Sequence, residues 1–433
     1  MAKTGNIIRK KSTKTYVFSY ALIVGFWAVV QIMGHMGLLS SKMLGLLIPI
    51  CAYAIMAVSL NLVVGFLGEL SLGHAAFMLS GATAGVVFYN GAGLNMPQVP
   101  RVIITLIIGA AAAGLFGVIV GVPVLRFSGD YLAIVTLAFC QILKNVLSTT
   151  YLGVDSKGVH LALEQSSFRL EPGAKPLIKG AQPISGINKI SPDMMISFTV
   201  GIVLLLLTVT FVLNLMNSRA GRAITAIRDD EIAAKSIGIN LTRYKLMAFI
   251  SSAVFAGLAG VIYVLNLSTL DFKKYDYNLS INVLVMVVLG GMGNVPGSII
   301  AAALLTLLPE LLRDFSQYRM FIYSIVLIVI MLFNQAPVFV QLRQRLAAKL
   351  RGNRQMPEET VETADAGYFE AKKSGKEEEL YGTFGSDESR HLLWRTSGSF
   401  RLPAVGRFRT SVWSDRPEWR RKDNRVQHAD RHV

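Results

Sequence analysis

Residues 194–216 read MMISFTVGIVLLLLTVTFVLNLM and contain no charged side chain. A transmembrane helix needs about 20 predominantly apolar residues to cross the hydrocarbon core of a bilayer, so this stretch is predicted to span a membrane. The whole composition agrees: 52% of the 433 residues are hydrophobic and 16% are charged, whereas a soluble domain carries about 25% charged residues. The sequence therefore predicts an integral membrane protein.

Outside this stretch, further apolar segments follow one another along most of the chain. The segments 70–89, 279–292 and 297–312 are short or rich in small residues, which let helices approach closely in lipid. We predict an all-α bundle of about ten spans within a transmembrane domain over 17–340. The predicted spans are 17–34, 44–64, 70–89, 102–125, 131–150, 194–216, 245–267, 279–292, 297–312 and 320–336.

Basic residues are unevenly distributed between these spans, and their distribution predicts the orientation. The N-terminal segment 1–16 is basic, and so are the connection 217–244 and the start of the tail 341–433. Cytoplasmic connections of membrane proteins carry an excess of Lys and Arg, so both termini are predicted to be cytoplasmic. The turns expected on the same side are 65–69, 126–130, 217–244 and 293–296. The longest external connection, 151–193, is expected to be a surface loop with room for one short helix.

The tail 341–433 differs from the rest of the chain in composition. It mixes charges of both signs and lacks sustained apolar periodicity, so it cannot bury enough apolar surface to fold and is expected to be disordered. The net charge of +16 is a property that nucleic-acid-binding proteins also have. Here, many of the basic residues lie in connections and at the two ends, where they set membrane orientation, and no nucleic-acid partner is expected.

The connection 217–244, NSRAGRAITAIRDDEIAAKSIGINLTRY, is polar although it lies between two apolar spans. Isoleucines recur in it at helical spacing, acidic residues at 229–231 favour the start of a helix, and Gly238 is suited to end one. The segment is therefore predicted to form one short amphipathic helix. Such a helix either docks on a cytoplasmic partner or lies on the membrane surface.

The string from Arg228 to Ala234, followed by Gly238, Ile239 and Asn240, resembles the EAA-type coupling loop of ABC importer permeases. More narrowly, it is similar to that loop in the branched-chain amino acid permease family. The resemblance implies that this loop enters a groove on an ATPase subunit and carries nucleotide-driven motion into the membrane. The residues to which it assigns this role are Arg228, Asp229, Glu231, Ala233, Ala234 and Gly238.

Other segments resemble the same family, in the same order, between about Lys42 and Leu332. They are Asn61 to Phe77, Gly129 to Phe139, Ser218 to Arg222 and Asn278 to Gly297. The family usually has Gln or a small apolar residue where this chain has Glu69, which we expect at the cytoplasmic edge of a span.

The resemblance implies the permease subunit of an ATP-driven importer of branched-chain amino acids in a bacterial inner membrane. The implied partners are a homologous second permease, two ATPase subunits and a periplasmic substrate-binding protein. Relatives that carry urea, other amino acids or amides, or sugars remain alternatives. Polar groups inside a membrane are candidates for a translocation path, although a histidine there is often only hydrogen-bonded within the bundle. The candidates are Ser71, Gly73, His74 and Asn282.

Several kinds of site are missing from the sequence. There is no G-x-x-x-x-G-K-[ST] loop to hold phosphates and no recognisable catalytic motif, so we expect no enzyme and no cofactor on this chain, with ATP on a partner subunit. Cys51 and Cys140 lie in apolar segments without metal-ligand spacing, and no metal site is expected. An ion-coupled secondary transporter would need charged residues within its spans, and a non-transporting scaffold would not need the ordered permease motifs.

Overall fold

The computed structural model describes residues 2–328, with gaps at 39, 92–95, 126–129, 156–157, 163–174, 188, 191–192, 313–317, 319–320, 323 and 326–327. Most of the predicted turn 126–130, most of the predicted span 320–336 and the whole tail 341–433 lie outside the described residues.

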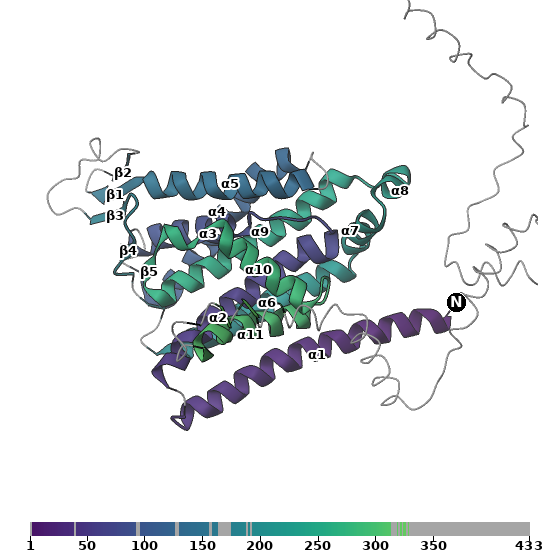
Figure 1. Cartoon of the computed structure of the whole chain (residues 1–433), viewed down its shortest axis with the longest axis horizontal. Coiled ribbons are helices and arrows are strands. Elements are labelled where there is room, and N and C mark those ends of the chain that lie inside the picture. The colour runs from purple at the N-terminus through teal and green to yellow at the C-terminus, as the bar shows by residue number, and fades with distance from the viewer. Residues whose placement is uncertain are drawn as a thin grey trace, which may run out of the picture. The chain divides into compact units, whose positions relative to one another are not determined.

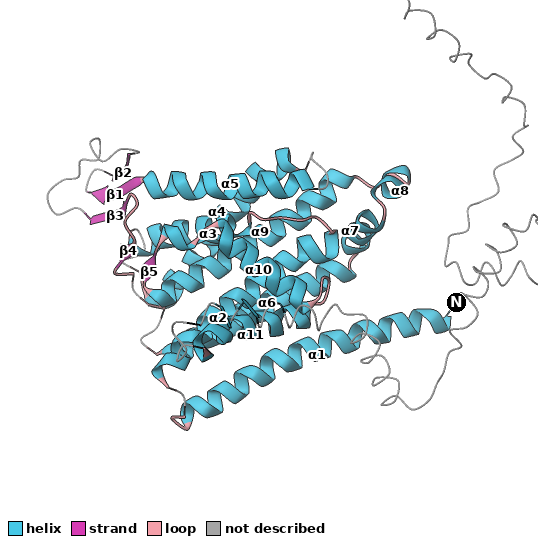
Figure 2. Ribbon diagram, in the orientation of Figure 1, coloured by secondary structure: helices cyan, strands magenta, loops and turns pink. Residues whose placement is uncertain are grey.

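Helices dominate the part of the chain that the structure describes (Figures 1 and 2). Six are long and apolar enough to cross a membrane, and two shorter apolar helices follow. The six are α1 (Ala2–His35), α2 (Ser41–Asn61) continued by the π-helix η1 (Leu62–Leu67), α4 (Gln98–Val124), α5 (Asp130–Thr149), α6 (Met194–Asn217) and α9 (Leu241–Leu267). The two shorter ones are α10 (Tyr277–Gly290) and α11 (Val295–Leu311).

The predicted helical bundle is thus confirmed, with six to eight apolar candidate spans where about ten were predicted. The difference has two sources. The helix α3 (His74–Asn90) has 17 residues, fewer than the predicted segment 70–89, because the chain before His74 is not helical. The other source is the predicted span 320–336, which lies largely outside the described residues.

The connection 151–193 contains strands, and none of its described residues is helical, while residues 163–174 of this connection, where the expected short helix could lie, are outside the described residues. The strands β1 (Tyr151–Asp155), β2 (Gly158–Ala162) and β3 (Lys175–Lys179) form an antiparallel sheet in the order β2-β1-β3. A second pair joins β4 (Ile184–Ser185) to β5 (Thr269–Leu270). Pairing satisfies backbone groups locally, and the sheet buries Leu152, Leu177 and Ile178.

Small residues allow α3, α4 and α9 to pack against one another at short distances (Figure 1). A Cβ atom added to Gly81 of α3 would lie 2.4 Å from the Cα atom of Gly257 of α9. A Cβ atom on Gly257 would lie 2.4 Å from the Cβ atom of Ala113 of α4. The close approach predicted for the glycine-rich segment 70–89 is therefore confirmed.

Connections that were predicted to share a side of the membrane contact each other. In the set predicted to be cytoplasmic, Arg228 donates a hydrogen bond to the carbonyl oxygen of Gly65 at 3.2 Å. In the set predicted to be external, β4 pairs with β5, and the Tyr89 hydroxyl donates to the carbonyl oxygen of Lys189 at 3.3 Å. Figure 1 shows the strands and the helices α7 (Arg219–Asp229) and α8 (Glu231–Ser236) at opposite ends of the bundle.

Candidate functional site

The connection 217–244 folds into two helices, α7 and α8: α8 is the helix predicted to begin at the acidic residues and to end at Gly238, and α7 was not predicted as a separate helix. Asp230 separates them because its backbone is extended, with φ −158° and ψ 110°. Its carboxylate accepts hydrogen bonds from the backbone N–H groups of Ile232 at 2.9 Å and Ala233 at 3.0 Å. An aspartate in this position satisfies N–H groups that have no partner within the helix. Asp230 therefore ends α7 and begins α8.

Gly238 ends α8 in the left-handed conformation that was predicted, with φ +85°. The N–H of Ile239 donates to the carbonyl oxygen of Ala234 at 3.1 Å, and the N–H of Gly238 donates to that of Lys235 at 3.1 Å. This pair of bonds is the Schellman motif. A Cβ atom at Gly238 would meet nothing within 4 Å, so the positive φ, and not lack of space, favours glycine here.

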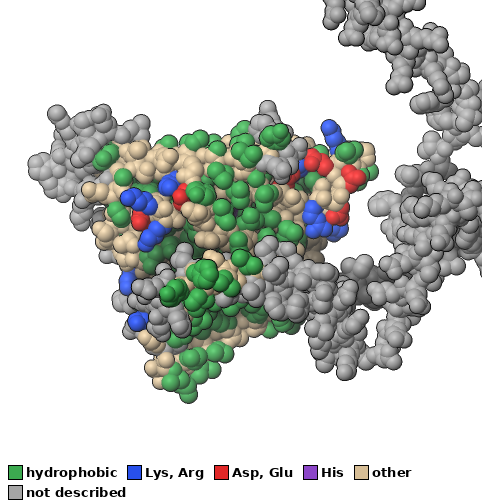
Figure 3. All heavy atoms as spheres, viewed as in Figure 1, with side chains coloured by type: hydrophobic (Ala, Val, Ile, Leu, Met, Phe, Trp, Pro, Cys, Tyr) green, Lys and Arg blue, Asp and Glu red, His purple; other side chains and the backbone are tan. Residues whose placement is uncertain are grey.

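The isoleucines of the two helices have different environments. Ile224 and Ile227 of α7 are buried against the bundle, whereas Ile232 of α8 is 83% exposed and Ile237, just after α8, is 73% exposed. Of the residues predicted to couple, Ala234 is buried, and Arg228, Asp229, Glu231, Ala233 and Gly238 are exposed. Figure 3 shows acidic and basic side chains gathered over α7 and α8. The isoleucines of α7 therefore pack against the bundle, whereas those in and just after α8 are exposed to the surroundings.

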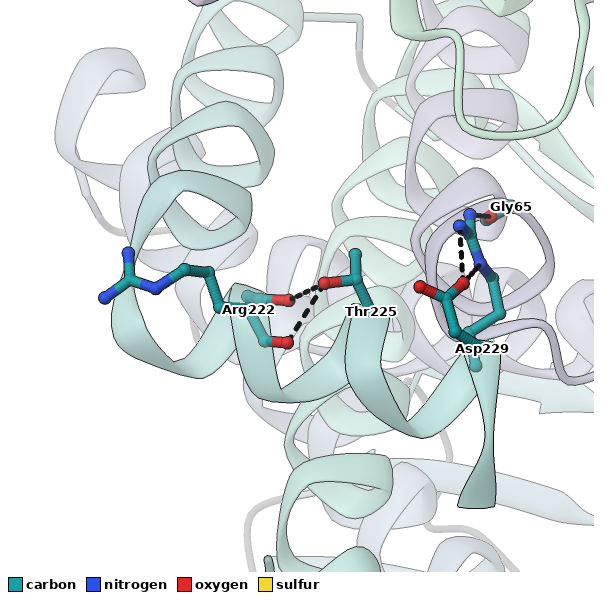
Figure 4. A network of polar contacts seen from close by, with 6 residues as sticks. Gly65, Arg222, Thr225 and Asp229 are labelled. Atoms are coloured by element: carbon teal, nitrogen blue, oxygen red, sulfur yellow. Dashed lines mark hydrogen bonds and ion pairs between the residues drawn. The ribbon is translucent and has the colours of Figure 1, made fainter. Parts of the chain in front are cut away.

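Arg228 connects the end of α7 to the segment that follows α2. Its Nη1 atom donates to the carbonyl oxygen of Gly65 at 3.2 Å, and its Nη2 atom lies 3.0 Å from the carboxylate of Asp229 (Figure 4). The neighbouring Gly68 has φ +81°, and a Cβ atom there would lie 2.7 Å from Cγ of Arg228. The arginine side chain therefore packs directly on the turn 65–69.

A buried lysine makes a second connection between the segment 65–69 and the connection 217–244. The Nζ atom of Lys245, the fifth residue of α9, lies 2.6 Å from Oε1 of Glu69 and 3.1 Å from Oε2 of Glu231. The lysine side chain is 4% exposed, that of Glu69 is 11% exposed and that of Glu231 is 45% exposed. Sequence reasoning did not identify Lys245, because a basic residue at the edge of a span is also what membrane orientation requires.

Three of the four candidates for the translocation path lie where α3 begins. Nε2 of His74 is 2.9 Å from Oγ of Ser59, and both residues are buried. A Cβ atom on Gly73 would lie 2.5 Å from the carbonyl oxygen of Thr136. Ser71 is also buried, and its hydroxyl has no hydrogen-bond partner in the part of the chain that the structure describes.

The fourth candidate, Asn282, is exposed on α10 and does not belong to this buried group. Ser280 instead connects α10 to α3, since its hydroxyl accepts a hydrogen bond from the N–H of Ala75 at 2.9 Å. The signal for Ser280 in the sequence is weak, because it is one small polar residue in an apolar helix. Such residues hydrogen-bond between helices in membranes.

Asn61, at the end of α2, is fully buried and makes hydrogen bonds to the turn between α10 and α11 and to α11 itself. Its Nδ2 atom donates to Oγ of Ser298 at 3.0 Å, and its Oδ1 atom accepts from the N–H of Gly293 at 2.8 Å. Asn61 therefore fixes the junction of α2 and η1 to the start of α11.

Asp276 joins α10 to α5 at the end of the bundle that carries the strands. Its carboxylate accepts a hydrogen bond from the N–H of Tyr277 at 2.8 Å, lies 3.3 Å from Nζ of Lys144 and accepts from Gln141. Partial burial raises the pKa of Asp276, but these hydrogen bonds and the charge of Lys144 outweigh it and lower the pKa below its usual value.

Two further features of the described residues concern metal binding and an apolar hollow. None of their His, Cys, Asp and Glu side chains gather in a group of three that could hold a metal ion. A hollow of about 340 Å³ between α1, α2, α6 and α11 is lined by apolar side chains, including Phe26, Cys51 and Leu304.

Comparison with known proteins gives consistent matches. The sequence model of a family described as the permease component of a branched-chain amino acid transport system matches residues 42–333. The high-affinity branched-chain amino acid transport system permease protein LivM of Salmonella typhimurium is 35% identical over 303 residues, 69% of this chain and 70% of the relative. LivM of Escherichia coli is 34% identical over 302 residues, with the same coverage. The fructose import permease protein FruG of Bifidobacterium longum is 25% identical over 296 residues, 66% of this chain and 80% of the relative. No solved structure matches.

Proposed function

Because the chain belongs to the branched-chain amino acid transport permease family, we propose that α7 and α8 couple it to an ATPase subunit. The chain is the permease component of a branched-chain amino acid ABC transport system, and this component is not an enzyme. In our proposal, ATP binds to the separate ATPase subunit, and α8 docks in a groove on that subunit.

The observation that carries this proposal is the exposure of Ile232 and Ile237, although α8 itself is attached to the bundle through Glu231 and the buried Ala234. Buried apolar side chains supply most of the energy of a docking contact, and these two isoleucines have no cover within the described residues. The alternative is a helix that lies on the membrane surface with its apolar face in the lipid. The apolar face of α7 instead packs against the chain's own bundle through Ile224 and Ile227, which favours docking.

We further propose the composition of the complete importer. It contains this chain, a homologous second permease, two ATPase subunits and a periplasmic binding protein in a bacterial inner membrane, and it moves leucine, isoleucine or valine inward. The similarity to FruG, whose name describes fructose import, keeps a sugar as the alternative substrate. Uptake of radiolabelled leucine and fructose into proteoliposomes with the complete importer distinguishes them.

Replacing both Ile232 and Ile237 with alanine is expected to weaken retention of the ATPase subunit after detergent extraction. Each substitution removes an exposed apolar contact without changing the backbone, at a cost of about 1 kcal/mol or more if the contact matters for docking. Together they correspond to about a 30-fold weaker affinity or more. The measurement is a quantitative pull-down of the ATPase, with Lys42→Glu, an exposed change outside the loop, as the control. Full retention by the double variant would contradict docking through α8.

Orientation follows from the same proposal. We propose that the connections 65–69, 217–244 and 293–296 are cytoplasmic, that the connection 151–193 is external and that both termini are cytoplasmic, as the distribution of basic residues favours. A cysteine at Lys3 or Lys235 should react with a membrane-impermeant maleimide only from the cytoplasmic side. A cysteine at Lys179 of β3 should react only from outside. Reaction of Lys179 and Lys235 variants from the same side would disprove this topology.

A further inference from the structure

Lys245 occupies a position where a single ammonium group contacts two segments that are far apart in the sequence. Glu69 is 176 residues away from it and Glu231 is 14 residues away. A buried charge is costly unless it is paired, so Lys245 holds both carboxylates close to itself. The turn 65–69 and the start of α8 are therefore fixed to the same atom.

Arg228, near the end of α7, joins the connection 217–244 to the segment 65–69 at a second point, through its hydrogen bond to Gly65 and its packing on Gly68. Two separate contacts between two segments restrict rotation as well as translation. A displacement of α7 and α8 together would therefore also move the segment 65–69, unless one of the two contacts breaks.

The segment 65–69 includes the last three residues of η1, and η1 leads directly into the buried polar groups of the bundle. The N–H of Glu69 donates to the carbonyl oxygen of Val63 within η1 at 3.1 Å. At the other end of η1, Asn61 hydrogen-bonds to Gly293 and Ser298, and Ser59, two residues earlier, lies beside His74. Short π-helices inside α-helices often occur at functional sites. The π-helix η1 lies between the contacts with α7 and α8 on one side and the buried polar groups of Ser59, Asn61 and His74 on the other.

We propose that Lys245 is a positioning residue that joins α8 to η1, so that movement of α8 displaces η1 and the polar groups around Asn61. This inference rests on the proposed coupling of α8 to an ATPase. In this proposal the lysine has no direct role in binding substrate or nucleotide. It acts through Glu231 on one side and Glu69 on the other.

The test uses Glu231→Gln in the complete importer reconstituted into proteoliposomes. Glu231 is half-exposed, and its loss leaves the buried pair of Lys245 and Glu69 intact, so the chain should fold. We expect the ATPase to remain bound and hydrolysis to continue, while leucine uptake per ATP hydrolysed falls about fivefold or more, within the usual range of coupling effects. Lys245→Arg, which keeps the charge and can reach both carboxylates, should retain most of the coupling.

A double-mutant cycle separates joint action from two independent effects. If Lys245 joins the two carboxylates, Glu69→Gln and Glu231→Gln should together reduce uptake per ATP hydrolysed no more than the larger single effect. Unchanged uptake per ATP in Glu231→Gln, or effects of the two substitutions that simply multiply, would overturn the inference. Failure of the wild-type chain to bind the ATPase would instead overturn the proposed function, and the pull-down detects that outcome separately.

Discussion

Replacing Gly238 with valine is expected to leave the chain inserted and folded but to weaken ATPase binding and uptake together. Valine would have to adopt the φ of +85° found at this position, which costs an L-residue roughly 1–2 kcal/mol and a β-branched residue more. If the backbone relaxes to avoid this strain, the Schellman bonds at the end of α8 are lost and Ile237 is displaced. Because α8 has only 6 residues, a change at its end affects the whole docking surface.

The expected effect of Gly238→Val is about a tenfold or greater loss of ATPase affinity, since 1.4 kcal/mol corresponds to a factor of ten. The measurements are a pull-down of the ATPase and substrate-stimulated ATP hydrolysis by the reconstituted complex. Gly186→Val is a matched control: Gly186 has φ +78°, and a Cβ atom there also meets nothing within 4 Å. It lies in the predicted external connection, so this variant should keep full ATPase binding.

Full partner binding and full stimulated hydrolysis in Gly238→Val would show that α8 is not the coupling element. A helix on the membrane surface would then be the better interpretation, because the bilayer tolerates a shifted helix end more easily than a shaped groove does. Loss of both activities in Gly186→Val as well would indicate general destabilisation instead.

The long helices could be predicted because the run of apolar residues that lipid requires is a local property of the sequence. The end of α8 at Gly238 was predictable for a similar reason, since a left-handed helix end favours glycine over other residues. The division between α7 and α8 was not predicted. Asp229, Asp230 and Glu231 look like one acidic first turn, and the sequence does not show which of them has the extended backbone that separates two helices.

The contacts made by Lys245 could not be predicted at all from local pattern. Its two partners come from different connections, and a pairing across 176 residues depends on how the bundle packs. The same holds for Asn61, whose partners Gly293 and Ser298 lie in the turn and helix after α10. The sequence indicated that polar groups lie inside the bundle, whereas only the fold shows which of them meet.

Replacing Gly257 with leucine is expected to have the largest effect on folding. A Cβ atom on Gly257 would already lie 2.4 Å from the Cβ atom of Ala113 and 2.9 Å from the carbonyl oxygen of Gly109, and its Cα atom faces Gly81. Backbone and Cβ atoms surround the site, so no change of side-chain rotamer makes room and the helices α3, α4 and α9 would have to separate. Overpacking usually costs about 1–3 kcal/mol, and separation of three helices places this change at or above the upper end.

We expect Gly257→Leu to lower the melting temperature in detergent by about 5 °C or more and to reduce the yield of inserted protein. Gly25→Leu is the matched control, because Gly25 lies in the apolar span of α1 with nothing within 4 Å of an added Cβ atom. That variant adds the same side chain to a transmembrane helix and should change stability by no more than about 0.5 kcal/mol. Equal melting temperatures and yields for the two variants would contradict the close packing of α3, α4 and α9. A selective loss in Gly257→Leu would show that this contact, made by residues without large side chains, is needed to hold α3, α4 and α9 together.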